Sequence, residues 1–194
     1  MSAWRISALI LALAAVAAFG ACNSSSGGPN DSRNEISFVG SSPSEACIDG
    51  DGTTDTEGHV TFTNVPMTFN FQSRIVGSAD TSAFNDVLLS SVDIAFDPPG
   101  VGQPASVTKA FNATIPVKGT GNGSVSVLTA ADVANYFNLL SENPPLQGQI
   151  RLTFHGRDAS GNVVTVSVPD SVNKVNYAVA SSCSSTLAAQ TKRK

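Results

Sequence analysis

Carboxylates are concentrated in one short stretch of the chain, residues 45–57, which contains five of them and no basic residue. Oxygen-bearing side chains recur there at alternate positions, an arrangement that a hard cation such as Ca²⁺ can use when it takes about six to eight oxygen ligands. The stretch is not an EF-hand loop, because Thr54 stands where that loop needs glycine. The sequence predicts a weak structural calcium site, with a solvated acidic loop as the alternative. The predicted ligands are Asp49, Asp51, Asp55 and Glu57.

The chain has only two histidines, His59 and His155, so no histidine-rich zinc site is evident. His155 could form a hydrolase triad with Asp158 and one of the many serines. However, the sequence contains no Gly-x-Ser-x-Gly nucleophile elbow. We therefore predict no catalytic residues and keep a hydrolase that uses His155 as the alternative.

The charge distribution excludes one large class of partner. Only 13% of the 194 residues are charged and the net charge is -4. Four of the 11 basic residues, Arg5 and those at 192–194, lie near the ends of the chain, whereas all 15 acidic residues lie between them. Nucleic-acid binding depends on a basic surface that neutralises phosphates, so we expect no nucleic-acid partner.

The first 21 residues have the pattern of an export signal. Arg5 supplies a positive charge, and residues 6–18 form an uncharged apolar run that is too short to span a bilayer, which needs about 20 residues. The segment ends in Phe19-Gly20-Ala21-Cys22, an apolar residue and two small residues before a cysteine.

This ending resembles the lipobox of bacterial lipoproteins, although Phe19 stands where that family prefers leucine. The resemblance implies that the signal is removed and that Cys22 is lipidated, which anchors the chain to a membrane through several acyl chains. Asn23 follows the cysteine, and the resemblance then implies the outer membrane where a cell has two. The alternative is ordinary cleavage that releases a soluble protein beginning at Ala21.

The other two cysteines, Cys47 and Cys183, form an even pair once Cys22 is assigned to the lipid. Outside the cytoplasm disulfides persist, so we predict a Cys47–Cys183 bond that ties the two ends of the domain together.

The body of the chain has the period-two pattern of half-buried strands, as in Met67-Thr68-Phe69-Asn70-Phe71 and in residues 92–96. Turn formers separate these runs, including the glycine-rich residues 119–123, where Asn122-Gly123 predicts a tight hairpin rather than a phosphate-binding loop. The pattern predicts an all-β fold, an antiparallel immunoglobulin-like β-sandwich of about eight strands.

One short helix is predicted at residues 129–140, because apolar side chains recur there at helical spacing and Thr129 precedes Asp132 as in a capping box. We expect it to plug one end of the core with Tyr136 and Phe137. Residues 150–168, with a turn at 158–162, resemble the closing hairpin of bacterial immunoglobulin-like repeats. The only tryptophan, Trp4, lies in the signal segment, which weakens the case for a sugar-binding platform but leaves Tyr136 and Tyr177.

The predicted organisation is a signal peptide at 1–21, a tether at 22–34, a β-sandwich domain at 35–183 and a tail at 184–194. We expect a lipid-anchored cell-envelope protein with a structural or binding role and no cofactor apart from calcium. The alternatives are an envelope hydrolase, a calcium-stabilised adhesin and a carbohydrate-binding module. The membrane is the expected partner, and the sequence does not specify a protein or glycan partner.

Overall fold

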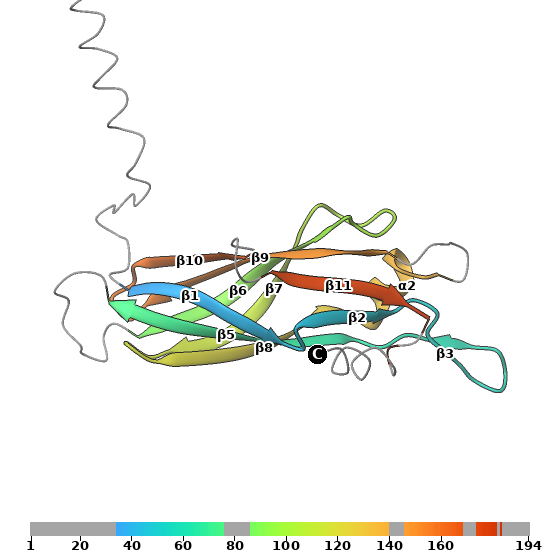
Figure 1. The fold of residues 1–194 in the computed structure, drawn as a ribbon, viewed down its shortest axis with the longest axis horizontal. Coiled ribbons are helices and arrows are strands. Elements are labelled where there is room, and N and C mark those ends of the chain that lie inside the picture. Colours follow the sequence, from blue (N-terminus) through green and yellow to red (C-terminus); the bar gives the residue numbers. More distant parts are fainter. Residues whose placement is uncertain (1–33, 76–85, 140–145, 169–173, 182, 184–194) are drawn as a thin grey trace, which may run out of the picture. The chain divides into compact units, whose positions relative to one another are not determined.

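The computed structural model describes residues 34–75, 86–139, 146–168, 174–181 and 183 (Figure 1). The chain divides into two units, Met1–Asp31 and Ser32–Lys194, and every described residue belongs to the second. This unit is an all-β sandwich with one short helix, which confirms the predicted fold class. The signal peptide, Cys22, nearly all of the tether and the tail at 184–194 lie outside the described residues.

The larger of the two layers is a six-stranded sheet (Figure 1). Its strands are β2 (Glu45–Asp49), β6 (Val87–Asp97), β7 (Val107–Ile115), β9 (Gln147–Asp158), β10 (Val163–Val168) and β11 (Val175–Ala180). The order is β2-β11-β9-β6-β7, and β10 also pairs with β9. The long strand β9 therefore carries β11 along its first half and β10 along its second half on one side, with β6 on the other side.

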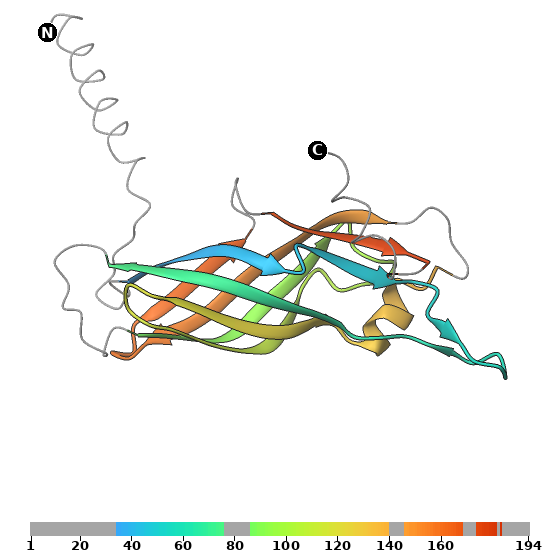
Figure 2. The ribbon, with the colours of Figure 1, turned by 60° about the horizontal axis from the view of Figure 1, so that its bottom comes forward.

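The smaller layer is a three-stranded antiparallel sheet in the order β1-β5-β8 (Figure 2). Its strands are β1 (Asn34–Ser42), β5 (Val65–Ile75) and β8 (Thr120–Leu128). A further two-stranded hairpin joins β3 (Thr53–Thr54) to β4 (Val60–Thr61). The described chain thus has eleven strands rather than about eight. The alternating pattern at residues 60–62 predicted β4, whereas β2 and β3 lie in the acidic stretch, where the alternation of apolar residues is weak.

The core lies between the two sheets and is rich in phenylalanine. Alternate residues are buried in strands such as β5, where the odd-numbered positions from 65 to 73 face inward. Phe69 and Phe71 of one layer stack edge-on against Phe154 of the other, with ring centroids 5.3 and 4.9 Å apart. This contact joins the layers through large apolar side chains, and burial of such side chains contributes about 1.5 to 3 kcal/mol each.

The glycine-rich residues 119–123 are not the predicted hairpin turn. The turn lies earlier, where Gly119 N donates to Pro116 O at 3.0 Å and Lys118 has a φ of 53°, and β8 begins at Thr120. Gly121 and Gly123 instead lie inside β8 against the edge of β7, where a Cβ atom would come within 2.3 Å of Thr114 O or 2.5 Å of Asn112 O. Glycine is needed here for the close approach of two strands that belong to different sheets.

Strand β2 is an exception to the antiparallel pattern. The chain leaves the smaller sheet at the end of β1 and adds β2 to the larger sheet, where it pairs in parallel with β11, the last strand. The second strand and the last strand of the domain therefore lie side by side.

The helix α2 (Ala130–Tyr136) is shorter than predicted but begins as predicted. Thr129 is its N-cap, with Asp132 N donating to Thr129 Oγ1 at 3.2 Å and Thr129 N donating to Asp132 Oδ2 at 2.8 Å. Phe137, the C-cap, packs against Phe96 and Tyr177 with ring centroids 5.3 and 6.0 Å away. The helix closes one end of the core, as predicted.

Candidate functional site

A row of polar side chains crosses the outer face of the larger sheet on β7, β6 and β9. Thr108 Oγ1 donates to Asp93 Oδ1, and Asp93 Oδ2 lies 2.9 Å from His155 Nε2. Asp93 and His155 face outward because each alternates with buried neighbours along its strand, and Thr108 is exposed between partly buried neighbours. The side chains of His155 and Asp93 are 40% and 38% exposed, so solvent reaches the row.

The carboxylate of Asp93 is held in its ionised form. The hydrogen bond from Thr108, followed by the hydrogen bond and the charge of His155, lowers the pKa of Asp93 below its ordinary value. In a catalytic triad the histidine lies between the nucleophile and the acid. Here Asp93 lies between the Thr108 hydroxyl and His155, so the hydroxyl donates its hydrogen bond to Asp93 and not to His155. The row can accept and donate hydrogen bonds to a ligand, but it is not ordered as a nucleophile and its base.

Asp158, the residue considered beside His155 in the hydrolase alternative, has a local role in the structure. It is buried and caps the turn between β9 and β10. Its Oδ1 accepts from Ser160 N and Asn162 N, and its Oδ2 accepts from the Asn162 side chain, each at 2.9 Å. The structure gives His155 a carboxylate from a neighbouring strand, Asp93, which sequence proximity did not suggest.

An open depression of about 540 Å³ adjoins His155 at the end of β9. Arg157 lies in it between Leu88 of β6 and Val163 of β10, which are its register partners on the two sides. Leu88 and Val163 are 50% and 47% exposed. Arg157 Nη1 donates to Gly161 O at 2.8 Å. The depression thus combines exposed apolar side chains and one cation with His155 and the carboxylate of Asp86.

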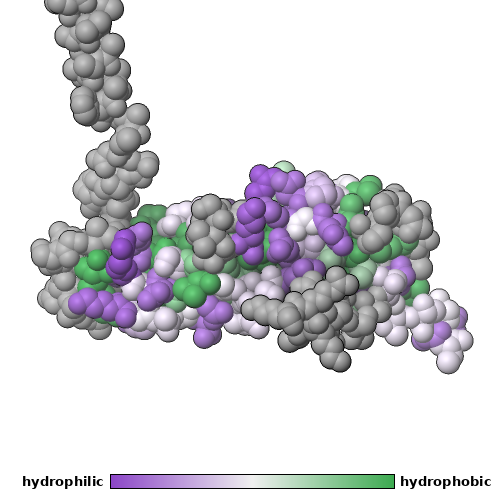
Figure 3. All heavy atoms as spheres, viewed as in Figure 1, coloured by the Kyte–Doolittle hydropathy of each residue, from purple (hydrophilic) through white to green (hydrophobic). Residues whose placement is uncertain are grey.

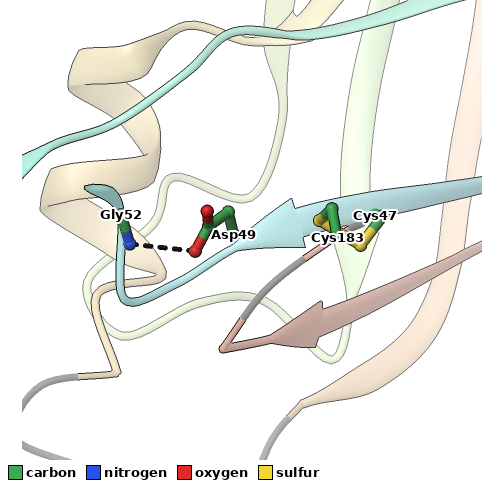
Figure 4. Close-up of a disulfide and its surroundings, with 4 residues drawn as sticks. All are labelled: Cys47, Asp49, Gly52 and Cys183. Atoms are coloured by element: carbon green, nitrogen blue, oxygen red, sulfur yellow. Dashed lines mark hydrogen bonds between the residues drawn. A yellow bond between two sulfur atoms is a disulfide. The ribbon is translucent and has the colours of Figure 1, made fainter. Parts of the chain in front are cut away.

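The acidic stretch is shaped by hydrogen bonds of its own carboxylates to the backbone. Asp49 Oδ1 accepts from Gly52 N at 2.9 Å (Figure 4). Asp55 Oδ1 accepts from Glu57 N and His59 N at 2.9 and 2.8 Å, and its Oδ2 lies 3.1 Å from His59 Nδ1. The backbone hydrogen bond from His59 is the largest influence on Asp55 and lowers its pKa.

These contacts spread the predicted calcium ligands over two turns. Among the described residues, no three His, Cys, Asp or Glu side chains form a group that could hold a metal ion. Calcium binding by Asp49, Asp51, Asp55 and Glu57 stays a prediction. In the structure, Asp49 and Asp55 accept hydrogen bonds from backbone N–H groups.

Cys47 of β2 and Cys183, just after β11, form a disulfide with Cα atoms 5.7 Å apart (Figure 4). The predicted pairing fits the structure, and the parallel pairing of β2 with β11 explains how residues separated by 136 positions meet. The bond ties the second strand of the domain to the segment that follows its last strand.

The two tyrosines do not form an exposed stacking platform. Tyr177 is 1% exposed, and its hydroxyl donates to Pro98 O. Burial, followed by the nearby charge of Asp97, raises the pKa of the Tyr177 hydroxyl. Tyr136 is partly buried against the core. Stacking on the flat face of a sugar would need side chains that lie open to solvent, so neither tyrosine offers the surface that such a platform requires.

Comparisons with known proteins do not assign a family. No family model and no curated protein matches the chain. Among solved structures, a putative late embryogenesis abundant (LEA) protein is 12% identical, with a TM-score of 0.36 and coverage of 84% of this chain and 81% of that chain. A structural-genomics target named SoR45 is 10% identical, with a TM-score of 0.32 and coverage of 72% and 84%. At these TM-scores the similarities carry no functional argument.

The described residues include no helix long and apolar enough to cross a membrane.

Proposed function

We propose that this chain is a lipid-anchored protein of the bacterial cell envelope, and that its β-sandwich has a binding or structural role rather than a catalytic one. The observation that carries the proposal is the distribution of the three cysteines. Cys47 and Cys183 are bonded to each other, which leaves Cys22, at the end of an export signal, as the remaining thiol. A disulfide that ties together distant parts of the domain sequence is typical of proteins outside the cytoplasm.

The length and composition of the tether determine how far the domain can lie from the lipid anchor. Eleven residues, mostly Ser, Gly and Asn, separate Cys22 from β1. A linker of this composition is expected to span roughly 20 Å root-mean-square, which would keep the domain near the membrane. Asn23 after the lipidated cysteine favours the outer membrane in a cell that has two.

The outer face of the larger sheet supports a binding role. The row of Thr108, Asp93 and His155 presents polar groups in fixed positions on three adjacent strands, beside the depression around Arg157. The order of the row supports binding over hydrolysis, because the Thr108 hydroxyl donates its hydrogen bond to Asp93, whereas the hydroxyl of a triad donates to the histidine that acts as base.

The experiment that tests the anchor is expression of the full chain in a bacterium with an outer membrane. The wild-type protein should partition into the detergent phase, and its N-terminal peptide should carry acyl chains at Cys22. Cys22→Ser should move the protein to the aqueous phase, whereas the nearby Ser25→Ala should not. A mature chain that begins at Ala21 and carries no lipid would refute the proposal.

A further inference from the structure

Charge is unevenly distributed between the two ends of the sandwich. We call the end at which β1 begins and β9 finishes the tether end. In the smaller sheet Asn34 pairs with Ile75 there, and in the larger sheet Val87 pairs with Ile115 on one side and with Asp158 on the other. The helix α2 and the β3–β4 hairpin lie toward the other end (Figure 1). At the tether end three cations balance three carboxylates, whereas the rest of the described residues have eight carboxylates against three cations. The tether-end cations are Arg74, Lys118 and Arg157, and its carboxylates are Glu35, Asp86 and Asp158.

The carboxylates at the tether end are mostly engaged by the protein itself. Asp158 is 94% buried in its turn, since only 6% of it is exposed. Asp86 Oδ1 accepts from Val117 N at 3.0 Å, and Glu35 forms an ion pair with Arg74. Lys118 and Arg157 are exposed. The described residues of this end therefore carry no net charge and expose two cations, whereas the rest of the described residues carry five more carboxylates than cations, so an anionic surface repels this end least.

Exposed apolar side chains accompany these cations. The described residues include four large exposed apolar side chains, and two of them, Leu88 and Val163, lie on either side of Arg157. Apolar areas lie among hydrophilic ones near the left end of the face shown in Figure 3, beside β10 and the start of β1. A cation between apolar side chains suits the boundary between anionic headgroups and acyl chains.

We propose that the tether end docks on the anionic surface of the membrane that holds the lipid at Cys22. This inference rests on the proposed lipidation and adds an orientation to it. The tether joins the domain at Asn34, so the lipid restrains the end that carries Lys118 and Arg157. The acidic opposite end is repelled by the same surface. The domain therefore stands on its tether end, with α2 and the β3–β4 hairpin directed away from the membrane.

The expected strength of docking on the anionic surface can be estimated from the exposed cations. One Lys or Arg close to an anionic leaflet favours binding by a factor of about five, and this factor falls away beyond a Debye length of about 8 Å at physiological salt. Arg157→Gln should therefore lower the ratio of docked to free domains about fivefold. Leu88→Ser should also lower it, because a serine side chain cannot bury apolar surface in the headgroup region.

The test uses the full lipidated chain in vesicles of phosphatidylcholine with or without phosphatidylglycerol. A fluorescent label is placed at Ser160→Cys, in the exposed turn at the tether end, or at Thr54→Cys, in the exposed β3 strand. Cys47 and Cys183 are bonded, so the introduced thiol reacts selectively. Lipids with a quencher in the headgroup region report which label approaches the surface.

Docking predicts strong quenching at position 160, weak quenching at 54, and loss of the difference without phosphatidylglycerol or at high salt. Lys174→Gln and Val101→Ser are the matched controls, because Lys174 lies roughly 20 Å along the sheet from Arg157 and Val101 is 66% exposed outside the tether end. Both controls should keep the difference in quenching between positions 160 and 54.

Equal quenching at 54 and 160 on vesicle-bound protein would overturn docking while leaving the anchor intact. Failure of the wild-type chain to bind either vesicle would overturn the anchor and docking together.

Discussion

Gly121→Ala is expected to destabilise the domain, because β8 passes so close to the edge of β7. The added Cβ would lie 2.3 Å from Thr114 O and 3.0 Å from Ile115 Cα, both backbone atoms. Neither can rotate away as a side chain could, so the two strands must separate. Overpacking of this kind costs about 1 to 3 kcal/mol of the free energy of unfolding.

Gly40→Ala is the matched control. Gly40 lies in β1, and no atom lies within 4 Å of the position its Cβ would take. Both substitutions reduce the freedom of the unfolded chain, which favours the folded state by about 0.4 to 1 kcal/mol. Subtracting the two effects removes this common part, so the difference between the variants measures the clash alone.

The assay is urea denaturation followed by circular dichroism, with melting temperatures as a second readout. We expect Gly121→Ala to unfold with about 1 to 3 kcal/mol less free energy than Gly40→Ala. For a domain of this size, each kcal/mol corresponds to roughly 2 to 4 °C in melting temperature. Equal stabilities of the two variants would show that β8 does not lie against β7 as described.

Two further predictions concern the disulfide and acid stability. Replacing Cys47 and Cys183 together by serine should lower the free energy of unfolding by up to about 5 kcal/mol, the chain-entropy value for a loop of 136 residues, and keep the β circular-dichroism spectrum. Two free thiols in the unfolded, unreduced wild-type chain would contradict this bond. Because the folded pKa of Asp93 lies below its ordinary 3.8, its stabilising contribution is present above that pH and is lost as the pH falls further. Wild-type stability should therefore decline more steeply than that of Asp93→Asn below this pH, and identical slopes in acid denaturation would argue against the Asp93 contacts.

Features set by neighbouring residues were predictable from the sequence. The alternation of apolar and polar residues in β5 and β6 requires only that one face of a strand be buried, so both strands were recognised. The helix start at Thr129 and the turn at 158–162 depend on contacts between residues three or four positions apart. The cysteine pair could be predicted because the lipobox resemblance accounted for the third cysteine.

Other features depend on which strands become neighbours. The strand β2 was missed because its short acidic sequence becomes a strand by pairing with β11, at the far end of the chain. His155 was considered beside Asp158, three residues away, whereas its partner Asp93 lies 62 positions earlier in the chain. The outward position of Asp93 could be predicted from its buried neighbours in β6, but the pairing of β6 with β9 could not.

The sequence by itself therefore determined the fold class, the start of the capped helix and the candidate disulfide, because each depends on local periodicity, local hydrogen bonds or residue type, and the export signal with Cys22 stays a prediction. The tertiary structure alone decided the joining of Thr108, Asp93 and His155, the close passage of Gly121 along β7, and the placing of Lys118 and Arg157 at the end from which the tether leaves. These arrangements depend on contacts between strands far apart in the chain, and several strand orders satisfy the same alternating pattern until the core is packed.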